Sequence, residues 1–212
     1  MKFDWLLRIV GNEPVFNSSL LLSGDIDPAD LGRQLSRWTR AGRLLQLRRG
    51  LYALAGPFQK TPAHPFLVAN GLKKGSYVSL ESALEYHGLI PEHTPNVVSV
   101  TTGRPETLAT PLGTYLFRHV KRELFFGYER IDLGEGQSAW IATPEKALLD
   151  LVYLTPLESG RAEVSFLEEL RLQNVAALSR SRLRAVSLRA DSPKLRRAVR
   201  RLESLFGKDF CP

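Results

Sequence analysis

Residues 27–54, DPADLGRQLSRWTRAGRLLQLRRGLYAL, contain the most informative pattern in this sequence. The pattern begins as a helix, because Asp27 is a favourable N-cap and Pro28 suits the first helical position. Gly42 suits the C-terminal end of the same helix. Apolar residues recur at the spacing of one buried helical stripe: Leu31, Leu35 and Trp38. We therefore predict an amphipathic helix with one polar face.

A hairpin follows this helix, and two shorter helical patterns precede it. In the hairpin, Leu45 and Leu47 alternate with polar residues, Arg49-Gly50 forms a tight turn, and LYAL returns. The shorter helical patterns cover residues 3–10 and 17–22. Three helices followed by a short hairpin is the order of a winged helix-turn-helix, in which the third helix reads DNA and the hairpin is the wing.

Arginines occupy the polar face of the helix and the hairpin. From residue 33 to residue 49 there are six arginines and no acidic residue. Guanidinium groups match both phosphates and the O6/N7 edge of guanine. A solvated basic helix beside an exposed turn is the alternative interpretation. The pattern favours DNA binding by Arg33, Gln34, Ser36, Arg37, Arg40, Arg43, Arg48 and Arg49.

The rest of the chain predicts an α+β fold. The proline-containing segment 57–64 is expected to be a linker, which divides the chain into a winged helix-turn-helix at 1–56 and a second domain at 65–212. We expect this second domain to hold a mostly antiparallel sheet with helices packed on it and a helical C-terminal part. Helices are predicted at 65–73, 80–87 and from 143, and strands at 77–79, 97–101, 114–120, 127–133 and 138–142.

The C-terminal helical part, with helices predicted at 163–172, 181–188 and from 192, is strongly basic. In the last of these helices an apolar face carries Leu195 and Val199, and arginines crowd the opposite face. That second face is a candidate surface for an anionic partner such as nucleic acid, and a solubilising surface is an equally good interpretation. Its four arginines are Arg196, Arg197, Arg200 and Arg201.

Composition narrows the class of protein. The 212 residues are 43% hydrophobic and 24% charged, which is enough apolar content for a folded core and excludes wholesale disorder. Net charge is +7, and it is distributed as +3 over residues 1–56, −2 over 57–160 and +6 over 161–212. Basic ends suggest an anionic partner. Without an apolar run of membrane-spanning length or a secretory signal pattern, and with Cys211 as the single cysteine, we expect a cytoplasmic protein.

The sequence offers little for catalysis. The four histidines lack metal-ligand spacing, and the sequence has neither a nucleophile elbow nor a phosphate-binding or dinucleotide-binding glycine loop. A hydrolytic set of Ser79, Glu81, Ser82 and His87 can be imagined, but Ser79 is better explained as a helix cap. Glu145 is explained in the same way at the start of the following helix. We predict that the protein is not an enzyme and needs neither metal nor cofactor.

Several motifs, in order, resemble the AbiEi-type antitoxins, the regulatory partners of type IV toxin–antitoxin pairs in bacteria and archaea. The most specific are YVSLESALEYHGLIPE at 77–92 and IATPEKALLDLVYL at 141–154. The supporting motifs are RRGLYAL (48–54), VVSVTTGRP (97–105), FRHV (117–120) and LFFGYE (124–129).

This resemblance implies a transcriptional autorepressor. The winged helix would bind inverted repeats in the promoter, and the C-terminal domain would counteract a nucleotidyltransferase-like toxin without forming a stable complex with it. The candidate antitoxin surface would then be the basic face that carries Arg196, Arg197, Arg200 and Arg201. Two alternatives stay open: a one-component regulator whose α+β domain senses a small ligand and has no toxin partner, and an enzyme directed to DNA, such as a nuclease. An RNA-binding role for the basic C-terminal region is compatible with the antitoxin function.

Overall fold

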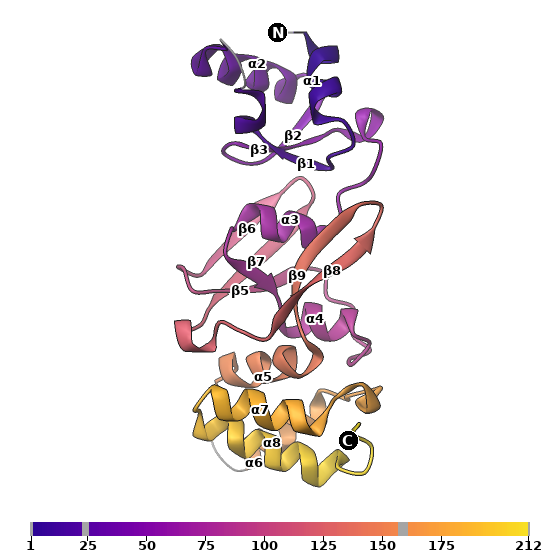
Figure 1. The fold of residues 1–212 in the computed structure, drawn as a ribbon, viewed down its shortest axis with the longest axis vertical. Coiled ribbons are helices and arrows are strands. Elements are labelled where there is room, and N and C mark those ends of the chain that lie inside the picture. The colour runs from indigo at the N-terminus through magenta and orange to yellow at the C-terminus, as the bar shows by residue number, and fades with distance from the viewer. Residues whose placement is uncertain (1, 23–25, 157–160, 212) are drawn as a thin grey trace.

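The computed structural model describes residues 2–22, 26–156 and 161–211. The molecule is elongated, with an N-terminal unit at one end, a mixed sheet in the middle and a layer of helices at the other end (Figure 1). This architecture confirms the predicted α+β class with a helical C-terminal part. Among the described residues, no helix is long and apolar enough to cross a membrane.

The N-terminal unit has a three-stranded antiparallel sheet in the order β1-β3-β2. The helix predicted at 17–22 is wrong, because only a 3₁₀ turn forms there, at Ser18–Leu21. Asn17 instead ends the first strand, where it pairs with Leu51. The elements of this unit are α1 (Phe3–Val10), β1 (Val15–Asn17), α2 (Pro28–Arg40), β2 (Leu44–Arg48) and β3 (Leu51–Leu54).

Helix α2 forms as its sequence predicts. The Asp27 side chain accepts a hydrogen bond from the backbone N–H of Ala29 at 2.8 Å, and Pro28 occupies the first turn. The apolar stripe of Leu31, Leu35 and Trp38 is buried. The ring of Trp38 meets the ring of Phe3 edge-on, with their centroids 5.2 Å apart, and so joins α2 to α1.

The β2–β3 hairpin is buried on both of its faces. Leu44, Tyr52 and Leu54 belong to the core of the N-terminal unit. Leu47, Leu51 and Ala53 belong instead to the core of the sheet. All four residues of β3 are buried for this reason. The hairpin therefore lies between the two cores and packs against both of them.

The central sheet has six strands in the order β6-β7-β5-β4-β9-β8. Three of its strand pairs are antiparallel, but β4–β9 and β5–β7 are parallel, so the sheet is mixed. Strand β6 was not predicted; it alternates between half-buried and exposed residues and carries no strong apolar signal. The strands are β4 (Ser76–Val78), β5 (Val97–Thr101), β6 (Glu106–Thr110), β7 (Gly113–His119), β8 (Tyr128–Gly134) and β9 (Gln137–Ala142).

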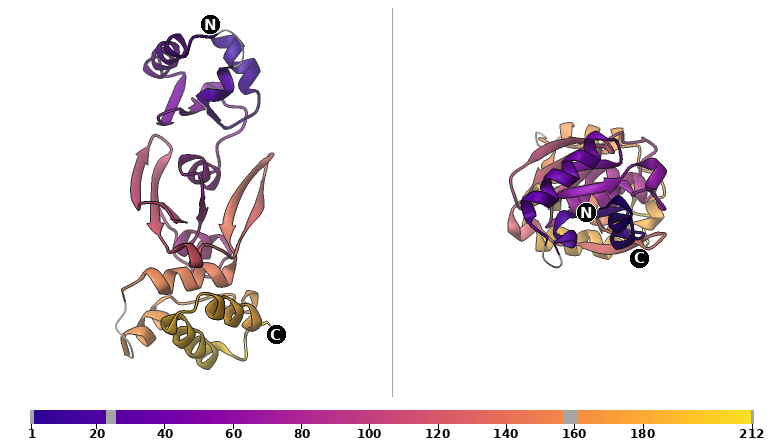
Figure 2. Two further views of the ribbon diagram at one scale, coloured as in Figure 1. Left: turned by 60° about the vertical axis from the view of Figure 1, so that its left-hand side comes forward. Right: turned by 90° about the horizontal axis from the view of Figure 1, so that it is seen from above.

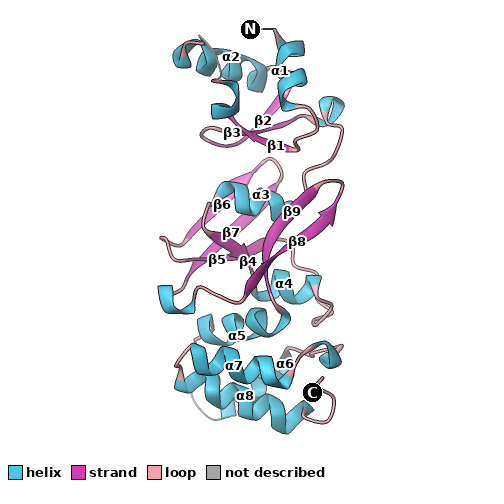
Figure 3. Ribbon diagram, viewed as in Figure 1, coloured by secondary structure: helices cyan, strands magenta, loops and turns pink. Residues whose placement is uncertain are grey.

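Helices cover this sheet and form the far end of the molecule. In the rotated view, α3 lies between the two arms of the sheet, and α5 to α8 gather beneath them (Figure 2). The end of the molecule that holds α5 to α8 is built of helices, whereas the rest combines helices with strands (Figure 3). The helices are α3 (Pro65–Leu72), α4 (Leu80–Tyr86), α5 (Pro144–Leu154), α6 (Arg161–Glu169), α7 (Arg180–Arg189) and α8 (Pro193–Phe206).

The segment predicted as a linker, 57–64, makes specific contacts at both ends. The ring of Phe58 packs against Phe3 of the N-terminal unit, with centroids 5.0 Å apart. At the other end, the Gln137 amide accepts from the backbone N–H of His64 at 2.8 Å and donates to the carbonyl of Pro62 at 2.9 Å. The connection between the two units is therefore held by side chains from both.

Candidate nucleic-acid interface

The polar face of α2 points away from both hydrophobic cores. Arg33, Ser36, Arg37 and Arg40 are exposed, and Gln34 is half-buried. This follows from the helical period, because burying Leu31, Leu35 and Trp38 turns the intervening residues outward. Helix α2 also lies at the end of the molecule farthest from α8 (Figure 1). The structure thus gathers these predicted residues on one accessible surface, which we call the α2 face.

One arginine of the α2 face is paired with an acid. The Arg33 guanidinium donates to the Asp30 carboxylate one helical turn earlier, and both side chains are about two-thirds exposed. An exposed ion pair of this kind is worth about 0–1 kcal/mol. A phosphate can therefore replace Asp30 as the partner of Arg33 at small cost.

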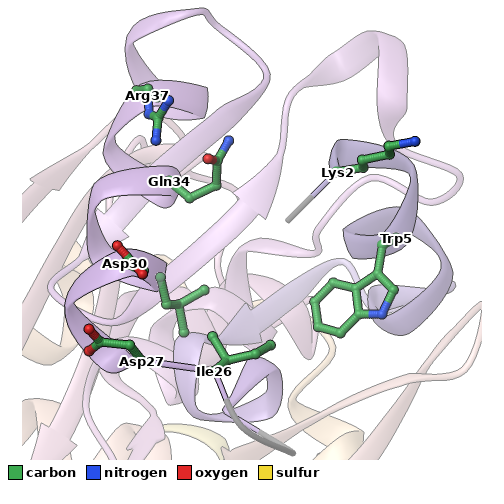
Figure 4. Close-up of a pocket in the computed structure, with 8 residues that line it drawn as sticks. Lys2, Trp5, Ile26, Asp27, Asp30, Gln34 and Arg37 are labelled. Carbon is green, nitrogen blue, oxygen red and sulfur yellow. The ribbon is translucent and has the colours of Figure 1, made fainter.

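A groove runs between α1 and α2 beside these residues (Figure 4). Its volume is about 620 Å³, and Lys2 and Trp5 lie on one side of it, with Gln34 and Arg37 on the other. Farther along α2 the groove meets Asp27 and Asp30. The charge along α2 therefore changes from acidic near its N-terminus to basic at Arg37.

The hairpin arginines lie in three different environments. The Arg43 guanidinium lies over the Phe3 ring, 5.2 Å from its centroid, so it still presents a charge near α2. Arg48 instead donates through Nη1 to the carbonyl of Leu72 in α3 at 2.7 Å, and lies 4.0 Å from the Glu106 carboxylate of β6. Arg49 is exposed in the turn. Since Arg48 contacts the sheet unit, the structure separates it from the predicted DNA-binding set.

The predicted C-terminal surface forms, but part of its charge is paired. Arg197, Arg200 and Arg201 are exposed on α8, opposite the buried stripe of that helix. Arg196 is half-buried and donates to Asp191 at 2.9 Å. A neighbouring arginine, Arg184 of α7, donates to Glu203 of α8 at 2.6 Å. We call the Arg200 and Arg201 region of this surface the α8 face.

A second group of charged residues is fully buried under the sheet. Lys146 and Asp150, one turn apart on α5, form an ion pair, and Lys146 also donates to the Tyr77 hydroxyl at 2.9 Å. Tyr77 and Ser79 donate to the second carboxylate oxygen of Asp150, each at 2.9 Å. Burial lowers the pKa of Lys146 and raises that of Asp150, and in both cases the partner opposes the shift. Burial and the Asp150 charge raise the pKa of Tyr77.

We call Tyr77, Ser79, Lys146 and Asp150 the buried quartet; its contacts and those of Glu145 correct two predictions about helix caps. Ser79 precedes α4, but its hydroxyl contacts Asp150 and does not cap the helix. Thr143 caps α5, accepting from the backbone N–H of Lys146 at 3.3 Å. Glu145 is buried, and its carboxylate accepts from the backbone N–H of Ser179 at 2.9 Å. A Lys–Asp pair at i, i+4 within an otherwise apolar helix was the sequence signal for this cluster.

The imagined hydrolytic set does not assemble. Ser82 bridges strand β5, because its hydroxyl accepts from the backbone N–H of Val98 at 2.9 Å. His87 Nε2 donates to the carbonyl of Ala142 at 2.8 Å, whereas the Ser79 hydroxyl donates to Asp150, so the two side chains have different partners. Within residues 2–22, 26–156 and 161–211, no group of three or more His, Cys, Asp or Glu side chains is placed to hold a metal ion.

These features define an α+β protein in which a mixed six-stranded sheet separates a small basic N-terminal unit from a basic helical layer. The fold is similar to the crystal structure of the Rv2827c protein from Mycobacterium tuberculosis, with a TM-score of 0.54 and 18% sequence identity. The similarity covers 99% of this chain and 80% of that one. At this identity the likeness concerns the fold alone. No family model and no curated protein matches the chain.

Proposed function

We propose that this protein is a DNA-binding transcriptional regulator whose N-terminal unit is a winged helix-turn-helix. The observation that carries the proposal is the α2 face, on which Arg33, Arg37 and Arg40 project from one end of the molecule. Two further features support it. The elements of the unit follow the order helix, strand, turn, helix, hairpin. Its three-stranded sheet, in the order β1-β3-β2, packs beneath α2.

The environment of the hairpin refines how DNA would be bound. Because Arg48 contacts Leu72 and both faces of the hairpin are buried, the hairpin does not extend freely as a long wing. In this proposal α2 enters the major groove, and Arg43 and Arg49 contact the backbone. Binding would then depend more on α2 than on the hairpin.

We further propose that the regulator is the autorepressing antitoxin of a type IV pair. This step rests on the resemblance of segments 77–92 and 141–154 to the AbiEi-type antitoxins. The second unit would counteract a nucleotidyltransferase-like toxin, and the exposed charges of the α8 face are its candidate surface. DNA binding and toxin neutralisation would therefore occupy opposite ends of the molecule.

The DNA-binding proposal is tested by comparing the DNA upstream of the protein's own gene with a scrambled duplex of equal length, at two salt concentrations. The wild-type chain should prefer the upstream DNA, and Arg33→Ala/Arg37→Ala should lose that preference, at about 1–3 kcal/mol for each base-reading arginine. The matched control is Lys121→Ala/Arg122→Ala, which removes two exposed cations far from α2. Equal, salt-sensitive binding to both duplexes would reduce the α2 face to a nonspecific basic surface.

The antitoxin step needs a separate assay. Arg200→Ala/Arg201→Ala should leave promoter binding unchanged and weaken rescue of cells that express an adjacent nucleotidyltransferase-like gene. Both side chains are exposed, so the variant should fold normally, as a thermal melt will show. Full rescue by this variant would exclude the α8 face as the neutralising surface.

A further inference from the structure

A basic cleft lies at the junction of the two units, away from both the α2 face and the α8 face. Strands β1 and β3 close it on the N-terminal side, and α3 with the β8–β9 hairpin closes it on the other. Its volume is about 450 Å³. In the rotated view, the N-terminal unit sits above α3 and the β8–β9 arm (Figure 2). We call it the junction cleft.

An exposed tryptophan lines the junction cleft. Trp140 of β9 is 46% exposed, although tryptophan is usually largely buried. Two contacts fix its position: its backbone N–H donates to the Asn70 side chain at 2.6 Å, and its ring meets Tyr128 edge-on at 5.8 Å. A fixed, accessible indole provides a stacking surface for a flat aromatic ligand.

Two cations flank this tryptophan. Arg130 of β8 pairs directly with Trp140 across the hairpin, and its Nε donates to Ser138 Oγ at 2.8 Å, which orients the guanidinium. Lys74, just after α3, is exposed and lines the same cleft. In the part of the chain that the structure describes, no carboxylate lines the cleft, and neither cation forms an ion pair.

We propose that the junction cleft binds one nucleotide unit, with its base stacked on Trp140 and its phosphate held by Lys74 and Arg130. An acidic peptide would satisfy the cations but would leave the indole unused, whereas a nucleotide uses both. Asn17 of β1, which is exposed and lines the same cleft, supplies an amide that can donate to and accept from a base edge. The unit is either a free nucleotide or one residue of a single strand.

The first test follows the indole N–H signals of the full chain in a two-dimensional ¹⁵N NMR spectrum. The chain has three tryptophans, and Trp140→Phe assigns the signal of Trp140. Addition of ATP, or of an eight-residue oligodeoxythymidylate, should shift that signal. A shift with ATP indicates a free nucleotide, and a shift with the oligonucleotide alone indicates a strand. If neither probe shifts it, the proposal is wrong.

The second test measures affinity for whichever probe binds. Trp140→Ala should weaken binding about 10-fold, the loss expected of one stacked base, and Trp140→Phe should retain most of it. Tyr86→Ala is the matched control, since Tyr86 is 41% exposed and lies outside the cleft. Equal affinity in wild type and Trp140→Ala, with both folded by circular dichroism, would overturn the assignment.

The third test separates this site from the α2 face. Lys74→Ala/Arg130→Ala should weaken binding of the probe and flatten its salt dependence, and Lys121→Ala/Arg122→Ala should do neither. All measurements with the oligonucleotide are repeated in the Arg33→Ala/Arg37→Ala background. Loss of Trp140-dependent binding in that background would place the probe on α2 and would contradict a separate site.

Discussion

Helices α2 and α5 begin in the same way but place their charges differently. Each starts with a capping side chain followed by proline, Asp27-Pro28 in α2 and Thr143-Pro144 in α5. Every arginine of α2 is exposed, whereas Glu145 and Lys146, together with Asp150, are buried in α5. Charges on α2 are therefore available to a partner, and those on α5 hold the fold together.

The difference shows why charge in a motif does not by itself indicate a functional site. The TPEKALLD segment was among the most specific in the sequence, yet its acids and lysine are occupied by internal partners. Buried charges are costly unless they are paired and hydrogen-bonded. The exposed arginines of α2 do not need internal partners, because they remain solvated. The simplest reason for their presence is therefore an interaction with another molecule.

The largest effect is expected from breaking the buried quartet. Asp150→Ala leaves Lys146 without its carboxylate at a buried position and should lower the free energy of unfolding by about 3–5 kcal/mol. Urea denaturation measures this loss. Replacing both residues, as in Lys146→Met/Asp150→Leu, should restore much of the stability, because it removes the uncompensated charge. If Asp150→Ala is no less stable than wild type, the quartet does not hold α5 in place.

A smaller loss of stability is expected when the Arg48 side chain, which links the two units by a hydrogen bond, is removed. Arg48→Ala removes the hydrogen bond to the Leu72 carbonyl and should cost about 1–2 kcal/mol of stability, a value held down by the partial exposure of Arg48. Arg49→Ala is the matched control and should be neutral in the same urea titration. Equal losses for both variants would show that the contact with α3 contributes nothing.

The caps of the two helices should be about equally important. Asp27→Ala and Thr143→Ala each remove the side-chain acceptor for the first turn, and each should cost about 1 kcal/mol. Thermal unfolding of the two variants measures the comparison. A much larger loss for Thr143→Ala would indicate that the cap also supports the buried quartet.

The smallest effect on stability belongs to the α2 face. Arg37→Ala should change the free energy of unfolding by less than about 0.5 kcal/mol, because the side chain is exposed. Chemical denaturation provides the value, and the DNA-binding assay is then run on the same sample. If the variant loses 2 kcal/mol or more of unfolding free energy, Arg37 contributes to the stability of the fold, as Asp150 does, and is not simply an exposed side chain.

Much of the secondary structure was predictable from sequence, because local signals set it. The caps and prolines at 27–28 and 143–144 located two helices, and GEG at 134–136 located the β8–β9 turn. Two features were not predictable in this way. Residues 17–22 form a strand end and a 3₁₀ turn because Asn17 pairs with Leu51 of β3, a contact that helical periodicity does not contain. The parallel pairing of β5 with β7 depends on β6 occupying the sheet edge.

The candidate sites were predictable only in part. The α2 face followed from one helical period, which needs no tertiary information. The role of Arg48 depends on Leu72, and the surroundings of Trp140 depend on Asn70 and on Asn17 of another unit. Contacts between residues so distant in the sequence arise only once the chain has folded.

The connectivity of the two sheets has a consequence for the order of folding during synthesis. All strand pairing in the N-terminal sheet lies within residues 15–54. The central sheet, by contrast, cannot close until Ile141 has been made, because it pairs with Val78. Long-range parallel pairing of this kind is slow to form. We therefore expect the N-terminal unit to emerge from the ribosome and fold first. Until the central sheet forms, the hairpin residues that belong to the core of that sheet, Leu47, Leu51 and Ala53, would stay uncovered.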